Sequence, residues 1–273
     1  MDEVIDIPGF GYGILTPATA RAAPVTLVLL NAGLTHRVGP FRGYVAIARY
    51  LATRGVDVFR FDLPRVGDGP AAGVSVGAMV AATLDTLERE AGARCFVIGG
   101  ICSAADMAWH IAQDDPRIAG VWLLDGFAHR GRWFRLARVR KALRRPPWQW
   151  PRLAWRLLRG LRPEEPTRAA DIAVIRDWPE PKEFRRQSTN LLSRGVRILA
   201  MYTGGVSKYM MDRRQLDDTF GESCRHAGLA TTYWPEFDHT LMSPADRDRV
   251  LSSVGDWCEK FKVPAATSRL QAK

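Results

Sequence analysis

Cysteine is scarce in this chain. It occurs at four positions in 273 residues, and no two of these have the C-x-x-C spacing. The four are Cys95, Cys102, Cys224 and Cys258. This pattern argues against a structural zinc site and against a disulfide framework. No clustered set of histidine, cysteine and acidic residues implies a metal either, so we expect no metal, no cofactor and a reducing, cytoplasmic setting.

Long apolar runs are also absent. The run VTLVLL at 25–30 is among the longest, and it falls far short of the ~18–20 residues that span a bilayer. The first ten residues, MDEVIDIPGF, start acidic and contain no apolar signal core. We therefore expect neither a membrane-spanning helix nor a secretory signal, although peripheral membrane association stays open. With 47% apolar and 25% charged residues, the composition is that of a globular protein.

Acidic residues are missing from one segment. Residues 130–162 contain 12 arginines and lysines and no aspartate or glutamate, which exceeds the net charge of +10 of the whole chain. An anionic partner would bind here: an acidic acyl carrier protein, a coenzyme A phosphate or an anionic membrane surface. Residues 150–161 also carry apolar side chains at helical spacing, so the simpler alternative is a lid helix with solvated arginines. No nucleic-acid-binding motif is present, and we do not expect nucleic acid as a partner.

Strand-like and helix-like segments alternate along the rest of the chain. Short apolar runs without polar alternation are typical of strands buried on both faces, and segments with helical spacing lie between them. Residues 9–17 are expected to form part of an N-terminal hairpin of two strands. The further expected strands are 25–30, 56–62, 94–99, 118–125, 196–203 and 230–235, and the expected helices are 41–54, 75–91, 103–113, 182–194, 211–227 and 244–262. This alternation predicts an α/β fold whose mostly parallel sheet is covered by helices on both faces.

The basic segment interrupts the alternation after the sixth strand. We expect a core of residues 1–126 and 181–263, and a basic, tryptophan-rich helical cap at 127–180. Residues 264–273 are expected to form a flexible tail.

The stretch RCFVIGGICSAADMAW joins a predicted strand to a predicted helix. This order is typical of a nucleophile elbow, in which the residues two before and two after the nucleophile must be small. For Cys102 these residues are Gly100 and Ala104. For Ser103 they would include the bulky Ile101. The pattern favours Cys102 as the nucleophile, and a buried structural cysteine is the alternative.

A base and an acid can be assigned from the ends of later strands. The last strand leads into TTYWPEFDHTLMS, which places His239 where a catalytic base is expected. Asp125 ends the strand before the cap, and Asp212 lies beyond the penultimate strand. We favour Asp125, because neighbouring strand ends can offer a carboxylate to the same histidine nitrogen. Asp212 is the alternative acid, and a Cys–His dyad without an acid is also open.

Backbone donors for an oxyanion hole are expected beside the elbow. The loop after 25–30 would provide one N–H from Gly33 or Leu34, and Ser103 would provide the other. In the same loop, Asn31 and His36 either shape the loop or contact the substrate. Asp62, after its strand, is expected to hold loops together.

Three segments resemble the α/β-hydrolase superfamily: NAGLTHRVGPFRGYVAIARYLATRGVDVFRFDLPRVGDG (31–69), GGICSAADMA (99–108) and FDHTLMS (237–243). More narrowly, they are similar to the cysteine-elbow hydrolases associated with exosortase and polysaccharide gene clusters, which are described as serine aminopeptidase-like. The resemblance implies an eight-stranded, mostly parallel sheet, with Cys102 as nucleophile and His239 as base.

The sequence departs from this family pattern at two places. The family's acid after the penultimate strand is missing from TGGVSKYM, and the strand before the cap ends in LLDGF. We interpret the two departures together as a transfer of the acid to Asp125, an arrangement that thioesterase members of the fold use.

These features predict an acyl hydrolase that works through an acyl-enzyme on a Cys-His-Asp triad. A thioester or ester is the expected substrate, and a thioester is favoured because one thioester replaces another when a thiolate attacks it. An acyltransferase or cyclase could use the same residues. A non-catalytic binding protein that uses the basic cap is the alternative from another class.

Overall fold

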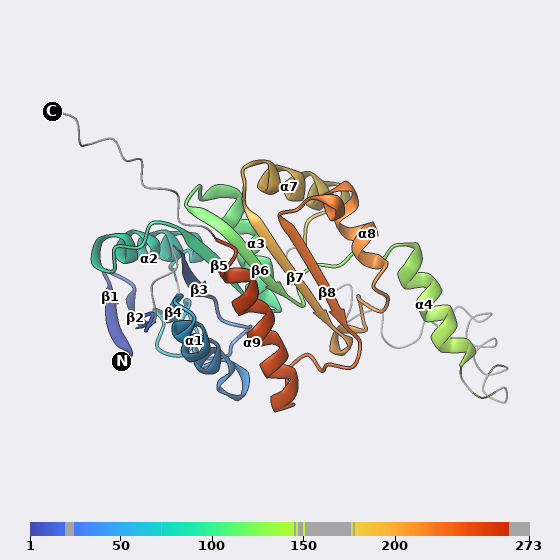
Figure 1. Ribbon diagram of the computed structural model, residues 1–273, viewed down its shortest axis with the longest axis horizontal. Coiled ribbons are helices and arrows are strands. Elements are labelled where there is room, and N and C mark those ends of the chain that lie inside the picture. The colour runs from blue at the N-terminus through green and yellow to red at the C-terminus, as the bar shows by residue number, and fades with distance from the viewer. Residues whose placement is uncertain are drawn as a thin grey trace.

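One mixed sheet organises the protein. The computed structural model describes residues 1–19, 25–71, 73–144, 146, 150, 176 and 178–261. In these residues an eight-stranded sheet has the order β1-β2-β4-β3-β5-β6-β7-β8 (Figure 1). The strands are β1 (Glu3–Ile7), β2 (Gly11–Thr16), β3 (Thr26–Leu29), β4 (Asp57–Phe61), β5 (Phe96–Ile101), β6 (Ile118–Leu124), β7 (Arg197–Thr203) and β8 (Leu229–Trp234). The pairings of β1 with β2 and of β2 with β4 are antiparallel, and all others are parallel.

Helices cover both faces of the sheet. The helices are α1 (Gly43–Thr53), α2 (Val76–Glu90), α3 (Ser103–Asp114), α4 (Arg132–Leu143), α7 (Pro181–Ser193), α8 (Gln215–Phe220) and α9 (Pro244–Cys258). Apolar residues of α1 and α9 share one core cluster, and those of α2, α3 and α7 share the other. The eight-stranded, mostly parallel sheet with helices on both faces was predicted from the sequence and is confirmed. No helix in the described ranges is long and apolar enough to cross a membrane.

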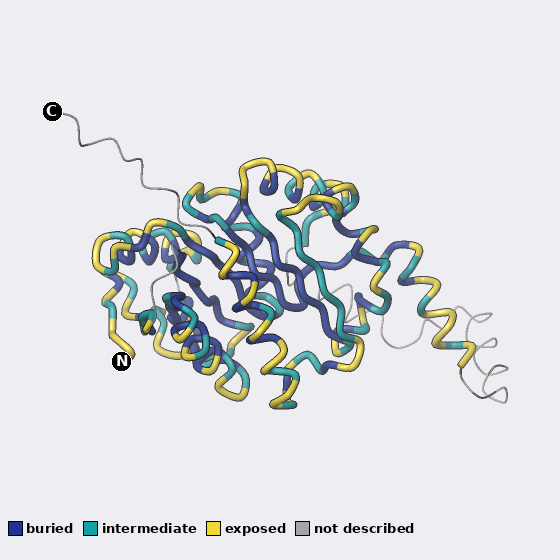
Figure 2. The backbone as a smooth tube through the Cα atoms, viewed as in Figure 1, coloured by how far each residue is buried: buried dark blue, intermediate teal, exposed yellow. Residues whose placement is uncertain are grey.

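The central strands are buried on both faces, as their continuous apolar runs predict. Along β5, Phe96 and Ile98 belong to the cluster under α2 and α3, while Val97 and Ile101 belong to the cluster under α1 and α9. Because successive side chains of a strand point to opposite faces, each strand links the two cores. Figure 2 shows this buried sheet running through the middle of the molecule.

Some predicted boundaries are wrong, and the reasons are local. The helix expected at 211–227 is divided into α8 and a 3-10 helix (Gly221–Arg225), because Gly221 has a φ of 59°, which ends the α-helix. The last helix ends at Cys258 and not at residue 262. Ser75 is the N-cap of α2, since the Ala78 N–H donates to Ser75 Oγ at 3.5 Å. Most of the cap prediction, including the helix expected at 150–161 apart from Trp150, lies outside the described residues, as does the tail at 264–273.

Two glycines allow a matched test of this packing. A Cβ on Gly99 would lie 2.3 Å from the Trp122 carbonyl oxygen of the neighbouring strand, whereas a Cβ on Gly77 of α2 would meet only Ser75 Oγ at 3.7 Å. Gly99→Ala should therefore lower the free energy of unfolding by about 1–3 kcal/mol. Gly77→Ala should raise it by about 0.5–1 kcal/mol, because alanine favours the helix. Urea unfolding of both variants checks this, and equal effects would contradict it.

Candidate active site

Three side chains from distant parts of the chain meet beside the carboxyl ends of the parallel strands. Cys102 lies between β5 and α3, Asp125 directly follows β6, and His239 lies in the loop between β8 and α9. His239 Nδ1 is 2.7 Å from Asp125 Oδ2. The same imidazole lies beside the Cys102 thiol, and the interaction of the two groups lowers the pKa of Cys102 and raises that of His239. The structure thus brings together the three residues that the sequence singled out.

The backbone at Cys102 has the strained shape of an elbow. Cys102 has φ 61° and ψ −119°, a conformation that residues with a side chain rarely adopt. A Cβ on Gly100 would lie 2.5 Å from the Ala104 Cβ, so the two small residues are needed where strand and helix approach. The Cys102 N–H donates to the Leu124 carbonyl of β6 at 2.8 Å. This bond fixes the turn against the neighbouring strand.

Asp125 is fully buried and held by the end of β7. Its Oδ1 accepts the Thr203 N–H and its Oδ2 accepts the Thr203 hydroxyl, both at 2.7 Å. The alternative acid, Asp212, lies elsewhere, and its carboxylate accepts two hydrogen bonds from the Arg214 side chain. Asp125 is therefore the carboxylate that contacts His239.

The loop after β7, where the family resemblance would place an acid, has no room for a side chain at its first two residues. A Cβ on Gly204 would lie 1.9 Å from the Pro235 carbonyl oxygen, and a Cβ on Gly205 would lie 2.2 Å from the main-chain nitrogen of His239. The Gly205 N–H also donates to the Phe237 carbonyl at 3.0 Å. These two glycines let the histidine loop pack directly on the end of β7.

The electrostatics of the site favour a charged cysteine–histidine pair. Burial by itself would raise the pKa of the Cys102 thiol. The hydrogen bond with His239, the positive charge of Arg176 and the Ser103 N–H nevertheless hold that pKa below its usual value. Burial opposes the charged form of His239 as well, but its bonds with Asp125 and Cys102 raise the pKa of His239 to about 10. The N-terminus of α3 lies at Cys102 and adds a favourable dipole for a thiolate.

A buried arginine that the sequence did not single out braces this pair. Arg176 donates to the Asp125 carbonyl at 3.0 Å, to the Tyr209 hydroxyl at 3.0 Å and to Asp106 Oδ2 at 2.5 Å. Trp178 Nε1 donates to the same Asp106 oxygen at 3.0 Å. Even with both bonds, burial raises the pKa of Asp106 to about 6. The guanidinium therefore connects α3, the end of β6 and the loop after β7.

No local sequence signal distinguishes Arg176 from the other arginines of its region. Thr203 is different, because it ends β7 beside the end of β6 and could have been found as the partner of Asp125 from the strand order.

Of the predicted oxyanion-hole residues, Gly33 and Ser103 contact each other, whereas Leu34 is exposed. The Gly33 N–H donates to Ser103 Oγ at 2.8 Å, and the Ser103 N–H bonds the Cys102 thiol. Leu34 is 85% exposed. Of the two candidates in this loop, Gly33 is the one with a contact to the residue after the nucleophile.

The same loop is anchored on Asp62. Asn31 is buried, its Nδ2 donates to Asp62 Oδ1 at 2.9 Å, and its Oδ1 accepts the Leu63 N–H at 2.7 Å. The Asn31 amide thus shapes the loop, and Asp62 holds the loops together as predicted.

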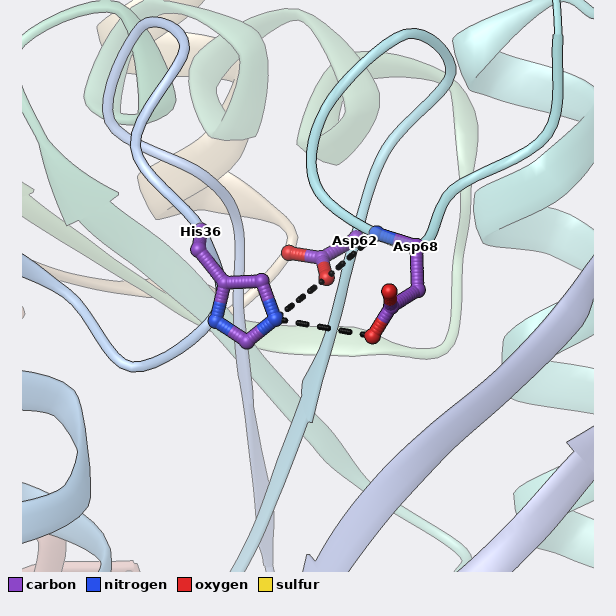
Figure 3. A group of neighbouring side chains, drawn as sticks. All are labelled: His36, Asp62 and Asp68. Carbon is purple, nitrogen blue, oxygen red and sulfur yellow. Dashed lines mark hydrogen bonds and ion pairs between the residues drawn. The ribbon is translucent and has the colours of Figure 1, made fainter.

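His36, Asp62 and Asp68 lie close enough together to hold a metal ion (Figure 3). His36 Nε2 is 3.1 Å from Asp62 Oδ2 and 3.6 Å from Asp68 Oδ2. Arg37 already pairs with both carboxylates, and it donates to Asp68 at 2.8 Å. The positive charge that this cluster needs therefore comes from the protein itself.

Solved structures with the same architecture are similar to this chain. No protein-family model matches the chain, and no curated protein matches it. An esterase of Pyrococcus furiosus superposes with a TM-score of 0.59 at 11% identity, covering 96% of this chain and 90% of that one. A dienelactone hydrolase from Anabaena variabilis superposes with a TM-score of 0.56 at 10% identity, covering 96% of this chain and 98% of that one. A thermophilic esterase from Thermogutta terrifontis superposes with a TM-score of 0.54 at 18% identity, covering 96% of this chain and 100% of that one. By its strand order and these likenesses, the chain has the α/β-hydrolase fold.

Proposed function

We propose that the protein is an acyl hydrolase with Cys102 as nucleophile, His239 as base and Asp125 as the acid that orients it. The observation that carries this proposal is the continuous contact from Asp125 through His239 to a cysteine at a strained strand–helix turn. Similar solved structures include two named as esterases and one named as a dienelactone hydrolase, and these names support hydrolysis of an ester-type bond. The resemblance to cysteine-elbow hydrolases of exosortase and polysaccharide gene clusters supports the same roles.

The geometry fits a two-step reaction. The Cys102 thiolate attacks the acyl carbon, and the resulting tetrahedral oxyanion collapses to an acyl-enzyme as the leaving thiolate or alkoxide takes the proton from His239. His239 then removes a proton from water, the hydroxide attacks the acyl-enzyme, and the carboxylic acid leaves as Cys102 becomes a thiolate again. Asp125 stabilises the imidazolium in both steps.

Backbone N–H groups would stabilise the oxyanion. Ser103 and Gly33 offer two donors beside Cys102, but the Gly33 N–H donates to the Ser103 hydroxyl at 2.8 Å. A rotation of that hydroxyl would free the Gly33 N–H for the substrate oxygen. A thioester is the favoured substrate, because the thiolate then exchanges one thioester for another before water completes the reaction.

The first prediction concerns the reactivity of Cys102 as a function of pH. Wild-type Cys102 should react rapidly with limiting iodoacetamide at pH 7, because its lowered pKa and the raised pKa of His239, about 10, keep the pair charged. His239→Ala removes the partner of the thiolate, so the pKa of Cys102 should rise and labelling at pH 7 should fall at least ~10-fold. Mass spectrometry of the labelled peptides across pH measures this.

Internal controls come from the other cysteines. Burial raises the pKa of Cys95, that of Cys224 to about 11 and that of Cys258 to about 12, so all three should react slowly. If Cys102 reacted no faster than Cys95, or equally fast without His239, the proposed nucleophile would be wrong.

The second prediction distinguishes the two candidate acids. Asp125→Asn can keep its bond with the Thr203 N–H but would direct an amide at His239, which favours the wrong tautomer. Acylation by a p-nitrophenyl ester or an acyl thioester should slow by about 100-fold or more. Asp212→Asn is the matched control and should change the rate less than ~2-fold, because this carboxylate binds Arg214. The reverse pattern would assign the acid to Asp212.

The third prediction separates charge from stability at Arg176. Arg176→Met removes the guanidinium that bonds the buried Asp106, so the free energy of unfolding should fall by about 3 kcal/mol. Cys102 labelling at pH 7 should also slow, because a positive charge near the thiolate is lost. In the double variant Asp106→Asn/Arg176→Met, stability should largely return while labelling stays slow. Arg186→Met, at an exposed ion pair, is the control and should change neither.

Recovery of both quantities in the double variant would mean that Arg176 only stabilises the fold. Urea unfolding and the rate of Cys102 labelling, measured on the same preparations, distinguish a purely structural role of Arg176 from an electrostatic effect on Cys102.

A further inference from the structure

Helix α4 exposes an apolar stripe. Leu136, Val139 and Leu143 are 37%, 54% and 59% exposed. Their spacing of three and four residues places them on one face of the helix. Figure 1 shows α4 extending away from the sheet and its covering helices. A surface helix of a globular protein normally turns such a stripe toward its own core.

The helix is anchored by a different face. Phe134 is buried, and at 3.6 residues per turn it lies roughly opposite the stripe. Trp133 is held between two guanidinium groups, with the Arg214 Cζ 3.9 Å and the Arg132 Cζ 5.1 Å from its ring centroid. Because these aromatic residues secure α4 to the body, the stripe is a second apolar face directed outward.

Positive charge borders the stripe. From residue 132 to residue 144 there are six basic residues and no acidic one: Arg132, Arg135, Arg138, Arg140, Lys141 and Arg144. Among the described residues, their one ion pair joins Arg132 to Asp218 at 3.9 Å. Arg135 and Arg140 flank the stripe on its two sides at helical spacing. Although Arg140 also acts on the carboxylate of Asp212, basic side chains outnumber acidic ones here, so the surface combines aliphatic side chains with an excess of cations.

Other exposed apolar side chains occur at the same edge of the sheet. Leu34 follows β3 and is 85% exposed, and Met242 follows β8 and is 65% exposed. Since α4 follows β6, all three segments extend from the carboxyl ends of parallel strands, the edge that also carries Cys102.

We propose that α4 lies in the interface of an anionic phospholipid membrane. Leu136, Val139 and Leu143 enter the boundary between headgroups and acyl chains, and Arg135 and Arg140 on the two sides of the stripe extend to the lipid phosphates. A membrane fits better than an acidic protein, because the stripe is purely aliphatic and is flanked by long cationic side chains, the pattern of interfacial helices. The proposal does not depend on acyl hydrolysis.

Sedimentation with vesicles tests it. The full chain should bind vesicles of phosphatidylcholine with about 30% phosphatidylglycerol at least ~10-fold more tightly than vesicles of phosphatidylcholine alone, and added salt should weaken this binding. Cys102→Ala should bind as the wild type does. Loss of activity and loss of membrane binding are therefore separable results.

Two sets of substitutions examine the two parts of the surface. Replacing Leu136, Val139 and Leu143 by Gln keeps the charge and should weaken binding at least ~10-fold. The double variant Arg135→Gln/Arg140→Gln keeps the stripe, and it should weaken vesicle binding by a similar factor. The matched controls are Val4→Gln, at a position 69% exposed on β1, and Arg89→Gln on α2, and both should bind normally.

All variants should keep the wild-type circular dichroism spectrum and melting temperature, because the substituted side chains are exposed. Absence of vesicle binding by the wild type would overturn the proposal, as would α4 variants that bind like the controls. Retention on an immobilised acidic carrier protein without vesicle binding would also overturn it and would assign α4 to a protein partner.

Discussion

The contact between Asp125 and His239 is the interaction on which the site depends. A carboxylate with no exposed surface is costly unless every part of it is bonded. Thr203 donates twice to its side chain, while Arg176 and Tyr209 both donate to its main-chain carbonyl. The resulting fixed negative charge holds the His239 ring and favours its protonated form. The pKa of Cys102 in turn responds to that imidazolium.

Two strained residues at adjacent strand ends make this contact possible. Cys102 and Asp125 both have positive φ values, 61° and 57°, although neither is a glycine. Each is fixed by the next strand along the sheet, since the Cys102 N–H donates to Leu124 of β6 and the Asp125 N–H donates to Met201 of β7. The sheet thus imposes the two turns and compensates for their strain. Rigid strands therefore hold the reactive side chains in position.

The described residues between β6 and α7 have two different roles. Arg176 and Trp178 reach inward and bond the first turns of α3 through Asp106. Helix α4 carries its charge and its aliphatic stripe outward. The segment between β6 and α7 therefore places one arginine, Arg176, beside the Cys102 site and carries the cations of α4 at the surface. The high net charge belongs to this region and does not reflect the hydrolase core.

Local patterns in the sequence determined the elements of the fold and the candidate residues. Apolar runs predicted the buried strands, small residues on both sides of Cys102 predicted the elbow, and the last strand end predicted the place of His239. These features are local, because strand burial and turn sterics depend on nearby residues. Helix boundaries were less certain where a single glycine, such as Gly221, decided them.

Only the tertiary structure decided which carboxylate contacts the histidine. Asp125 and Asp212 both follow strands, and only the packing of β6 against β7 brings one of them to His239 while Arg214 binds the other. The bracing by Arg176 and the fit of Gly204 and Gly205 against the histidine loop join segments far apart in the chain. The direction of the α4 stripe depends on which face Phe134 anchors. Such contacts follow from how elements pack, and the sequence of each element does not contain that information.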